Sequence, residues 1–126
     1  MRIDFEIPDQ LPTLNEYIRA ERTNRYAAAS LKRNVQEYIT WFLPKLRKPI
    51  ETHVFVYFLW IRKDARADKD NVAFAKKYIL DAMQEKGIIK RDSWKLVTPY
   101  DRGFMVNKTN PRTVVTVSTE RIDDWN

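Results

Sequence analysis

The sequence predicts an α+β fold, in which two main helices pack on a mixed β-sheet of about four strands, in the order β-α-β-α-β-β. Three observations lead to this prediction. A segment near the N-terminus alternates apolar and charged residues, a later run is apolar throughout, and two stretches repeat apolar residues at helical spacing. No repeat, low-complexity segment or linker interrupts the chain, so residues 1–126 are expected to form a single domain.

The first half of the chain is predicted to supply two strands and one helix. Residues 3–7 alternate in the manner of a strand with one buried face. From Ala27 onward the apolar residues fall at helical spacing, and Pro44 ends this helix. Residues 53–61 are apolar and rich in aromatic side chains, which indicates a central strand that is buried on both faces. Residues 15–26 show no clear period.

The second half is predicted to supply one helix and two strands. Asp68 or Asp70 caps a helix that runs to about Lys86, and Gly87 is its C-terminal stop. Residues 94–98 and 113–119 are predicted strands, and the segment around Gly103 that separates them is expected to turn.

Composition excludes several classes of site. The chain has no cysteine, which rules out a disulfide scaffold, a zinc–thiolate site and a cysteine nucleophile. Its single histidine, His53, rules out a histidine-rich metal site within one protomer. The charged N-terminus argues against a signal peptide, and no apolar run approaches the roughly 20 residues of a membrane helix. We therefore expect a soluble, cytoplasmic protein.

The net charge is +6, and the basic residues are unevenly distributed. Residues 19–48 carry eight basic side chains and two acidic ones, and a second basic cluster precedes Asp68. A solvated surface explains either cluster alone, but basic residues beside carboxylates suit an enzyme that holds a polyanion against its own acidic site. The side chains predicted to contact a DNA backbone are Arg22, Arg25, Lys32, Arg33, Lys63 and Arg66.

Several aromatic residues fall near these clusters. Tyr17 and Tyr26 are candidates for stacking on unpaired bases, although burial is the commoner role of a tyrosine. The tryptophans Trp41, Trp60 and Trp94 are predicted to lie in the core.

The segment Asp68-Lys69-Asp70-Asn71 carries the clearest chemical signal. It places two carboxylates where a strand hands over to a helix, and Asp92 follows that helix. In an extended segment, side chains two residues apart point the same way, so both carboxylates are able to converge on one ion. Mg²⁺ prefers a few carboxylate oxygens together with water and phosphate oxygens. Helix capping is the ordinary alternative, but it requires only one of the two aspartates.

This chain resembles the RusA family of Holliday-junction resolvases, in particular the small members carried by phages and prophages. The resemblance rests on four segments in addition to the opening motif, and it covers most of the chain. The opening motif is Pro12-Thr13-Leu14-Asn15-Glu16-Tyr17, and the four segments are residues 68–71, 78–83, 86–89 and 92–95. The sequence departs from the family pattern at Arg91, where a second acidic residue is common in the family.

The resemblance implies a homodimeric, Mg²⁺-dependent endodeoxyribonuclease that nicks four-way DNA junctions symmetrically in a bacterial or phage-infected cell. Asp68, Asp70 and Asp92 match the essential carboxylates and would hold one or two Mg²⁺ ions, for which Mn²⁺ can substitute. The family's catalytic helix lysine matches Lys77 or its neighbour Lys76. On a continuous helix, Lys77 lies about 20° from the direction of Asp70 and Lys76 about 120° away, which favours Lys77. Asn15 and Glu16 are assigned a supporting role near the site.

Two questions stay open at this level. After about 15 helical residues the chain is roughly 22 Å from Asp70, so Asp92 either returns along an almost straight path or serves a site near a dimer axis. The alternative functions are a nuclease for flaps or other branched DNA, and a branched-DNA-binding protein that does not cleave.

Overall fold

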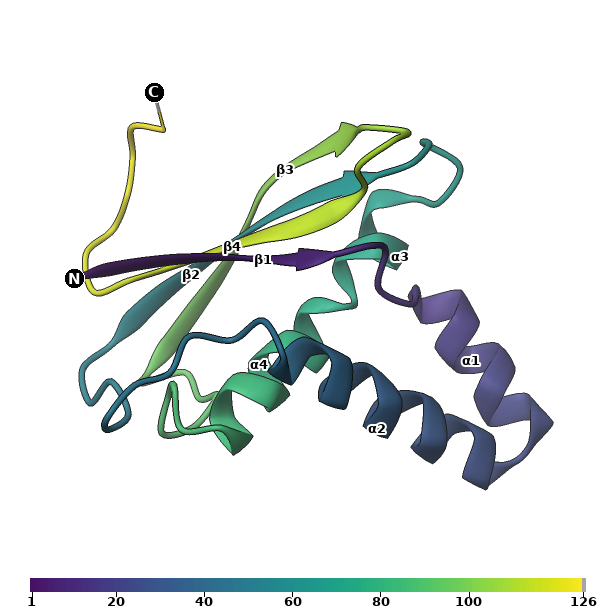
Figure 1. Ribbon diagram of the computed structural model, residues 1–126, viewed down its shortest axis with the longest axis horizontal. Helices are drawn as coiled ribbons and strands as arrows, with labels where there is room; N and C mark the ends of the chain where they lie inside the picture. The colour runs from purple at the N-terminus through teal and green to yellow at the C-terminus, as the bar shows by residue number, and fades with distance from the viewer. Residues whose placement is uncertain (126) are drawn as a thin grey trace.

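One mixed sheet of four strands organises the chain, and a computed structural model describes it for residues 1–125 (Figure 1). The strands are β1 (Arg2–Pro8), β2 (Val54–Arg62), β3 (Val97–Val106) and β4 (Arg112–Ser118). Their order is β1-β4-β2-β3. β2 pairs with β3 in parallel, and β4 pairs with β1 and β2 antiparallel. The predicted α+β fold is confirmed.

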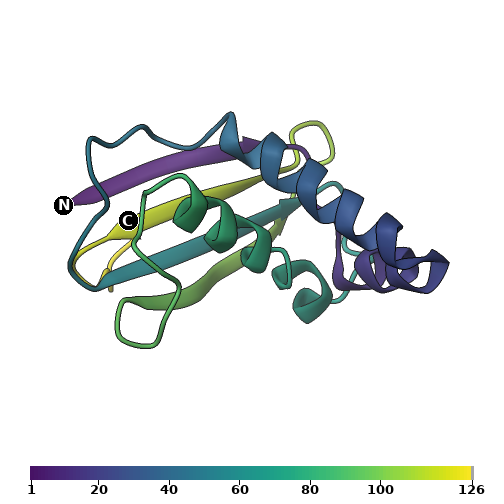
Figure 2. The same cartoon turned by 90° about the horizontal axis from the view of Figure 1, so that it is seen from below.

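All the helices lie on one face of this sheet (Figure 2). They are α1 (Leu14–Thr23), α2 (Arg25–Thr40), α3 (Lys69–Ala73) and α4 (Lys76–Glu85). α1 and the start of α2 extend beyond the end of the sheet (Figure 1). The predicted helical region of residues 68–86 thus contains two helices, and α1 precedes the helix that was predicted from Ala27, within the predicted order of elements. No helix in residues 1–125 is long and apolar enough to cross a membrane.

Helix α1 occupies a segment in which no element was predicted. It begins at a capping box, in which the Thr13 side chain accepts from the Glu16 backbone amide and the Glu16 carboxylate accepts from the Thr13 amide. Asn24 ends α1 and caps α2 through a 2.8 Å bond from the Ala27 amide. The threonine–glutamate spacing of the capping box was the available signal for this helix.

The predicted helix of residues 68–86 is interrupted between α3 and α4. At this point the amides of Ala75, Lys77 and Tyr78 bond to carbonyls three residues earlier, as in a 3₁₀ turn. The prediction of one continuous helix was therefore wrong. Its predicted end is confirmed, because Gly87 has a φ of 75° just after α4, a conformation that glycine adopts without strain.

Strand β3 differs from its prediction. Residues 94–96 form a turn, and the strand continues through Gly103, where a register shift places Arg102 in a bulge. β3 is an edge strand, and an edge tolerates Pro99, glycine and charged residues that a central strand excludes. Its sequence therefore lacks the apolar pattern by which strands are recognised.

The core lies between β2 and the helices. Val54, Val56, Phe58 and Trp60 face α2 and α4, and the predicted burial of Trp60 is confirmed at 2% exposure. The same prediction was wrong for Trp41, which is 84% exposed, and for Trp94, which is fully exposed. Both lie just beyond an element, Trp41 after α2 and Trp94 in the turn before β3, where no neighbouring layer covers them.

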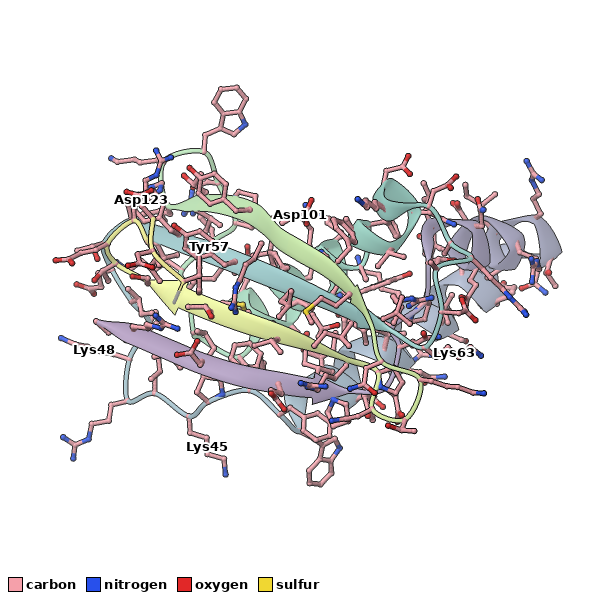
Figure 3. All side chains as sticks on the ribbon, turned by 90° about the horizontal axis from the view of Figure 1, so that it is seen from above. Lys45, Lys48, Tyr57, Lys63, Asp101 and Asp123 are labelled. Carbon is pink, nitrogen blue, oxygen red and sulfur yellow. The ribbon has the colours of Figure 1, made fainter. Side chains whose placement is uncertain are left out.

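On the opposite face, residues 122–125 pack against one end of the sheet. The Ile122 amide donates to the Tyr57 hydroxyl, and the ring of Trp125 packs against that of Tyr57 at a centroid distance of 4.9 Å. The guanidinium of Arg102 lies 4.2 Å from the centroid of Trp125. Figure 3 shows Tyr57 and Asp123 at this end of the sheet.

The hydroxyl of Tyr78 is buried and has no hydrogen-bond partner within residues 1–125. We predict that Tyr78→Phe raises the free energy of unfolding by about 1 kcal/mol, because it removes a desolvated polar atom that makes no bond. Urea denaturation measures this change. The matched control is Tyr38→Phe, which deletes a hydroxyl that donates to the Pro8 carbonyl at 2.9 Å and should cost about 1 kcal/mol.

Tyr78→Phe should also change how the free energy of unfolding depends on pH above 10. Burial, with smaller contributions from Tyr17 and Glu16, raises the pKa of Tyr78 to about 12 from 10.0. The unfolded chain therefore loses this proton first, and wild-type stability falls by about 2–3 kcal/mol between pH 10 and 12 from this group. Tyr78→Phe should lack that part of the decline. Equal slopes for both proteins would contradict the assignment.

Candidate functional site

Asp68 and Asp70 lie just beyond the C-terminal end of β2. Asp68 is extended and occupies the N-cap position of α3 without a side-chain cap bond, whereas Asp70 lies in the first helical turn. The expectation that both stand in an extended segment was therefore wrong for Asp70. Both residues are exposed, and within residues 1–125 neither carboxylate has a hydrogen bond or an ion pair. The capping explanation does not account for Asp68.

A pocket of about 330 Å³ adjoins this pair. Two basic side chains, Arg62 and Lys69, and two acidic ones, Asp64 and Asp68, supply its charged lining, and α3 and the end of β3 supply apolar side chains such as Val72 and Phe104. The ammonium of Lys69 lies 5.6 Å from the ring centroid of Phe104. Cationic groups therefore stand on the wall next to an unpaired carboxylate, as binding of a phosphate chain beside a metal requires.

Neighbouring charges in this loop are already engaged. Asp64 accepts from the Arg66 amide at 3.1 Å and pairs with its guanidinium at 3.8 Å, so it is not free to serve as a ligand. Arg62 donates to the Leu11 carbonyl at 3.1 Å. Burial lowers the pKa of Arg62, while Glu16 and Asp64 act in the opposite direction. Arginine nevertheless stays protonated in proteins.

The opening motif lies directly against the aspartate motif. The Asn15 amide donates to the Asn71 side-chain oxygen at 2.9 Å, and Tyr17 packs on Phe74 and Tyr78 at centroid distances of 5.7 and 6.4 Å. Two segments that lie 56 residues apart are thus joined at α3. The contact of Asn15 is made by its backbone amide, so the supporting role of its side chain stays a prediction, and Glu16 takes part in the cap of α1.

Asp92 lies at the opposite end of the sheet. It lines a separate hollow with Trp94, Val97 and other residues at the start of β3, whereas the pocket beside Asp68 is lined by the end of β3. The Asp92 amide donates to the Gln84 side chain at 2.8 Å, which ties it to the end of α4. β2 has nine residues, so the two ends of the sheet are about 26 Å apart.

A single site of Asp68, Asp70 and Asp92 is therefore not formed within one protomer. Among residues 1–125, no three aspartate, glutamate or histidine side chains lie close enough together to hold a metal ion. The chemistry of the Asp68 and Asp70 pair still fits Mg²⁺, which is commonly bound through one or two carboxylates with water and substrate phosphates. Asp92 could join that pair only from a second protomer.

The two candidate lysines have different partners. Lys77 is exposed and pairs with Asp81 at 3.4 Å, and Lys32 reaches the same carboxylate at 3.5 Å. Lys76 is half-buried and pairs at 2.9 Å with Asp101, which also accepts from the indole of Trp60. The angular argument that favoured Lys77 assumed one continuous helix, and the interruption before α4 removes its basis. The catalytic role of Lys77 therefore stays a prediction. Its competitor, Lys76, is held against the sheet by the ion pair with Asp101.

The predicted DNA-backbone side chains are all exposed, and they form two groups. Lys63 and Arg66 follow β2 next to the aspartate pair, and Figure 3 shows Lys63 at this end of the sheet. The other group lies on the hairpin of α1 and α2, and it comprises Arg22, Arg25, Lys32 and Arg33. Tyr26 is exposed beside Arg25, with the guanidinium 5.0 Å from its ring, whereas Tyr17 packs inward.

Asp101 is the residue that the sequence analysis missed. It holds Lys76 and Trp60 together and so fixes the start of α4 to β3. It lies in the segment expected to turn, which is why no role was assigned to it. Figure 3 shows it on β3.

Comparison with models of protein families gave no match, and comparison with curated protein sequences gave none. The resemblance to RusA resolvases therefore stays a prediction.

Loss of Asp68 or Asp70 should not destabilise the protein. We predict that Asp68→Ala and Asp70→Ala change the free energy of unfolding without Mg²⁺ by less than about 0.5 kcal/mol, because neither side chain makes a bond. Urea denaturation measures this. The matched control is Asn24→Ala, which removes a working cap and should cost about 1 kcal/mol. A loss of about 1 kcal/mol at Asp68 would restore the capping explanation.

Proposed function

We propose that this chain is a Mg²⁺-dependent, structure-specific endodeoxyribonuclease that resolves four-way DNA junctions as a homodimer. The carrying observation is the pair of exposed, unpartnered carboxylates at Asp68 and Asp70, set between cationic side chains. Two carboxylates without partners repel each other, and a bound cation removes that repulsion. A net charge of +6 supplies the attraction for a polyanion that the acidic pair alone would repel.

Each protein group has a role in this proposal. Asp68 and Asp70 would hold the ion, which when bound would polarise the phosphodiester and lower the pKa of an attacking water. Lys77 would contact the scissile phosphate once it leaves its exposed, weak ion pair with Asp81. Lys63, which is exposed, and Arg66, whose 3.8 Å pair with Asp64 lies in solvent, would hold flanking phosphates. Asn71, bonded to Asn15, keeps the short helix α3 and its carboxylate in place.

The dimer is proposed to complete the site. Asp92 and the aspartate pair lie at opposite ends of β3 within a protomer. In a dimer with a two-fold axis, every contact between the two protomers occurs twice. A contact that brings the Asp92 of one protomer to the aspartate pair of the other would therefore form two equivalent sites. Two sites related by this axis also match a junction that must be nicked symmetrically.

A nicking assay on a synthetic mobile four-way junction tests the function. Wild type with Mg²⁺ or Mn²⁺ should produce paired, symmetric nicks, and Asp70→Asn should reduce nicking by at least about 100-fold while still binding the junction. Glu51→Gln is a matched control, because Glu51 is an exposed carboxylate that pairs with Lys90 at 3.6 Å and with no other side chain of residues 1–125. Tight binding without cleavage by wild type would leave a branched-DNA-binding protein. Cleavage of flaps in preference to junctions would redirect the proposal to other branched DNA.

Mixing two inactive variants tests whether the site is shared. In a mixed dimer of Asp70→Asn and Asp92→Asn, a shared site leaves one intact combination of Asp70 with Asp92, whereas a site within each protomer leaves none. We predict that co-refolding the two variants restores about a quarter of wild-type nicking, as single rather than paired nicks. Each variant alone is the control. A mixture as inactive as its components would contradict the shared site.

A further inference from the structure

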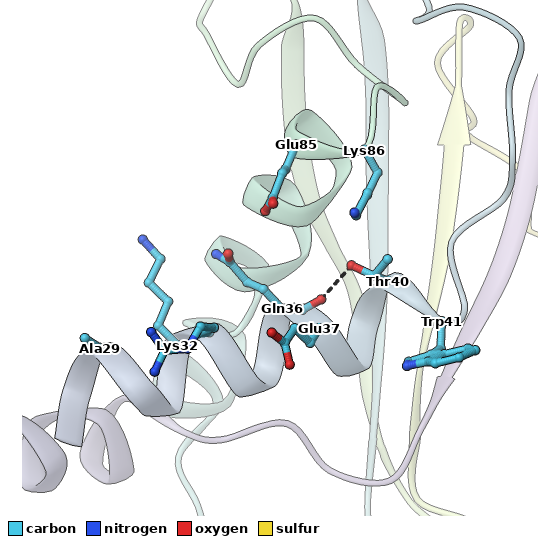
Figure 4. A pocket seen from close by; sticks show the side chains of 9 residues that line it. Ala29, Lys32, Gln36, Glu37, Thr40, Trp41, Glu85 and Lys86 are labelled. Carbon is cyan, nitrogen blue, oxygen red and sulfur yellow. Dashed lines mark hydrogen bonds between the residues drawn. The ribbon is translucent and has the colours of Figure 1, made fainter. Parts of the chain in front are cut away.

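A groove outside the acidic site runs between the C-terminal ends of α2 and α4 (Figure 4). It comprises a hollow of about 690 Å³ between the helices and an adjoining hollow of about 610 Å³ against the segment after α2. Thr40, Trp41 and Lys86 line both hollows, so Trp41 stands where the two meet.

The exposed indole of Trp41 is the unexplained feature of this groove. Its ring is 84% exposed and, within residues 1–125, makes no ring contact and no side-chain hydrogen bond. A large aromatic ring in water is unfavourable by its apolar area, and Trp is strongly enriched where a partner covers it. Trp41 thus borders both hollows of the groove and takes no part in the core.

Cationic side chains line both hollows. Lys32, which also pairs with Asp81 at 3.5 Å, and Arg33 line the hollow between the helices, Lys45 lines the adjoining hollow, and Lys86 lines both. Within residues 1–125, Lys45 and Lys86 have no ion pair, and Figure 3 shows Lys45 directed away from the sheet. Glu37 and Glu85 also line the groove, so basic side chains exceed acidic ones by four to two.

We propose that this groove binds a single-stranded segment of DNA, with one base stacked on Trp41 and adjacent phosphates held by the basic side chains. In a single strand, every base is flanked by phosphates, which matches an aromatic ring that borders two hollows lined by cations. An acidic peptide would satisfy the cations but offers no comparable flat ring. The inference rests on the proposed DNA function, and it adds a binding site that the acidic pair does not include.

The groove leads toward Asp92. The Ile50 amide donates to the Ile88 carbonyl at 2.9 Å, so the segment that follows Trp41 runs beside the segment that follows α4. Gln84, one residue before Glu85 on the groove wall, bonds the Asp92 amide at 2.8 Å. The end of α4 therefore connects the groove wall at Glu85 to the loop that carries Asp92. This position suits a strand unpaired at the crossover of a junction.

Binding of an oligothymidylate of about 12 nucleotides, measured by fluorescence anisotropy in EDTA, tests the proposal. Trp41→Ala should weaken binding about 5- to 100-fold, as expected for the loss of one stacked base, and Trp41→Phe should retain most of the affinity. The thermal unfolding midpoint should stay constant, because the ring packs against nothing in residues 1–125. Asn34→Ala, an exposed position on α2 that does not line the groove, is the control and should bind like wild type.

The basic side chains have their own readout. The double variant Lys45→Gln and Lys86→Gln should reduce the slope of log affinity against log salt by about 1.4, because each lost phosphate contact with a single strand removes about 0.7. Lys108→Gln, on the loop between β3 and β4, should leave the slope unchanged. Unchanged slopes for the double variant would overturn the proposed phosphate contacts.

Oligothymidylate binding by Trp41→Ala within about twofold of wild type would overturn the groove proposal. Trp41-dependent binding of polyglutamate in place of oligothymidylate would overturn it in favour of an acidic peptide. The readout requires no metal, so it is independent of nicking. If the wild type binds oligothymidylate through Trp41 but nicks no junction, the groove proposal stands and the nuclease proposal is refuted. If the wild type nicks junctions and Trp41→Ala changes neither binding nor nicking, the nuclease proposal stands and the groove proposal is refuted.

Discussion

The parallel pairing of β2 with β3 is the constraint on which the arrangement of chemical groups depends. Parallel neighbours cannot be joined by a hairpin, so the chain must return along the whole sheet before β3 begins. α3 and α4 make that return. The aspartates that precede the crossover are consequently left at one end of the sheet, and the aspartate that follows it is left at the other. Separation of the carboxylates thus follows from topology and not from a loop that could adopt another path.

A few polar contacts hold the crossover in position. α3 has five residues and no side-chain cap, which is too short for a helix to be stable on its own. It is held instead by the bond between Asn71 and the Asn15 amide and by burial of Val72 and Ala73. α4 is fixed at its start by Lys76 and Asp101, and that carboxylate also satisfies the buried indole of Trp60. The position of Asp70 therefore depends on residues that are distant in sequence, namely Asn15, in the segment after β1, and Asp101, on β3.

The sequence was sufficient for the elements whose apolar pattern is strong, and for little beyond them. β2 was predicted because a buried central strand is apolar on both faces, and the end of α4 because Gly87 takes a positive φ. α1 has only a short apolar stripe of Leu14, Tyr17 and Ile18, none of which is fully buried, and its clearer signal was the capping box at Thr13. β3 lies at the edge of the sheet, so its sequence does not need to be apolar on both faces and lacks the pattern that identified β2. The residue types of the site were visible in the sequence, but their grouping was not, because it depends on strand order. Nothing in the spacing of Asp70 and Asp92 distinguishes a hairpin return from a crossover.

Several exposed groups without partners are informative here because one ligand is able to engage all of them. The Asp68 and Asp70 carboxylates repel each other, the Trp41 ring is surrounded by water, and Lys45 and Lys86 have no counterion among residues 1–125. Different ligands could satisfy these groups one at a time. A nucleic acid strand satisfies all of them together, since it brings phosphates for the lysines, a flat base for the indole and phosphate oxygens that complete a metal's coordination beside the carboxylates. The proposed function is therefore favoured by economy, because one polymer accounts for acidic, basic and aromatic groups that would otherwise require three separate explanations.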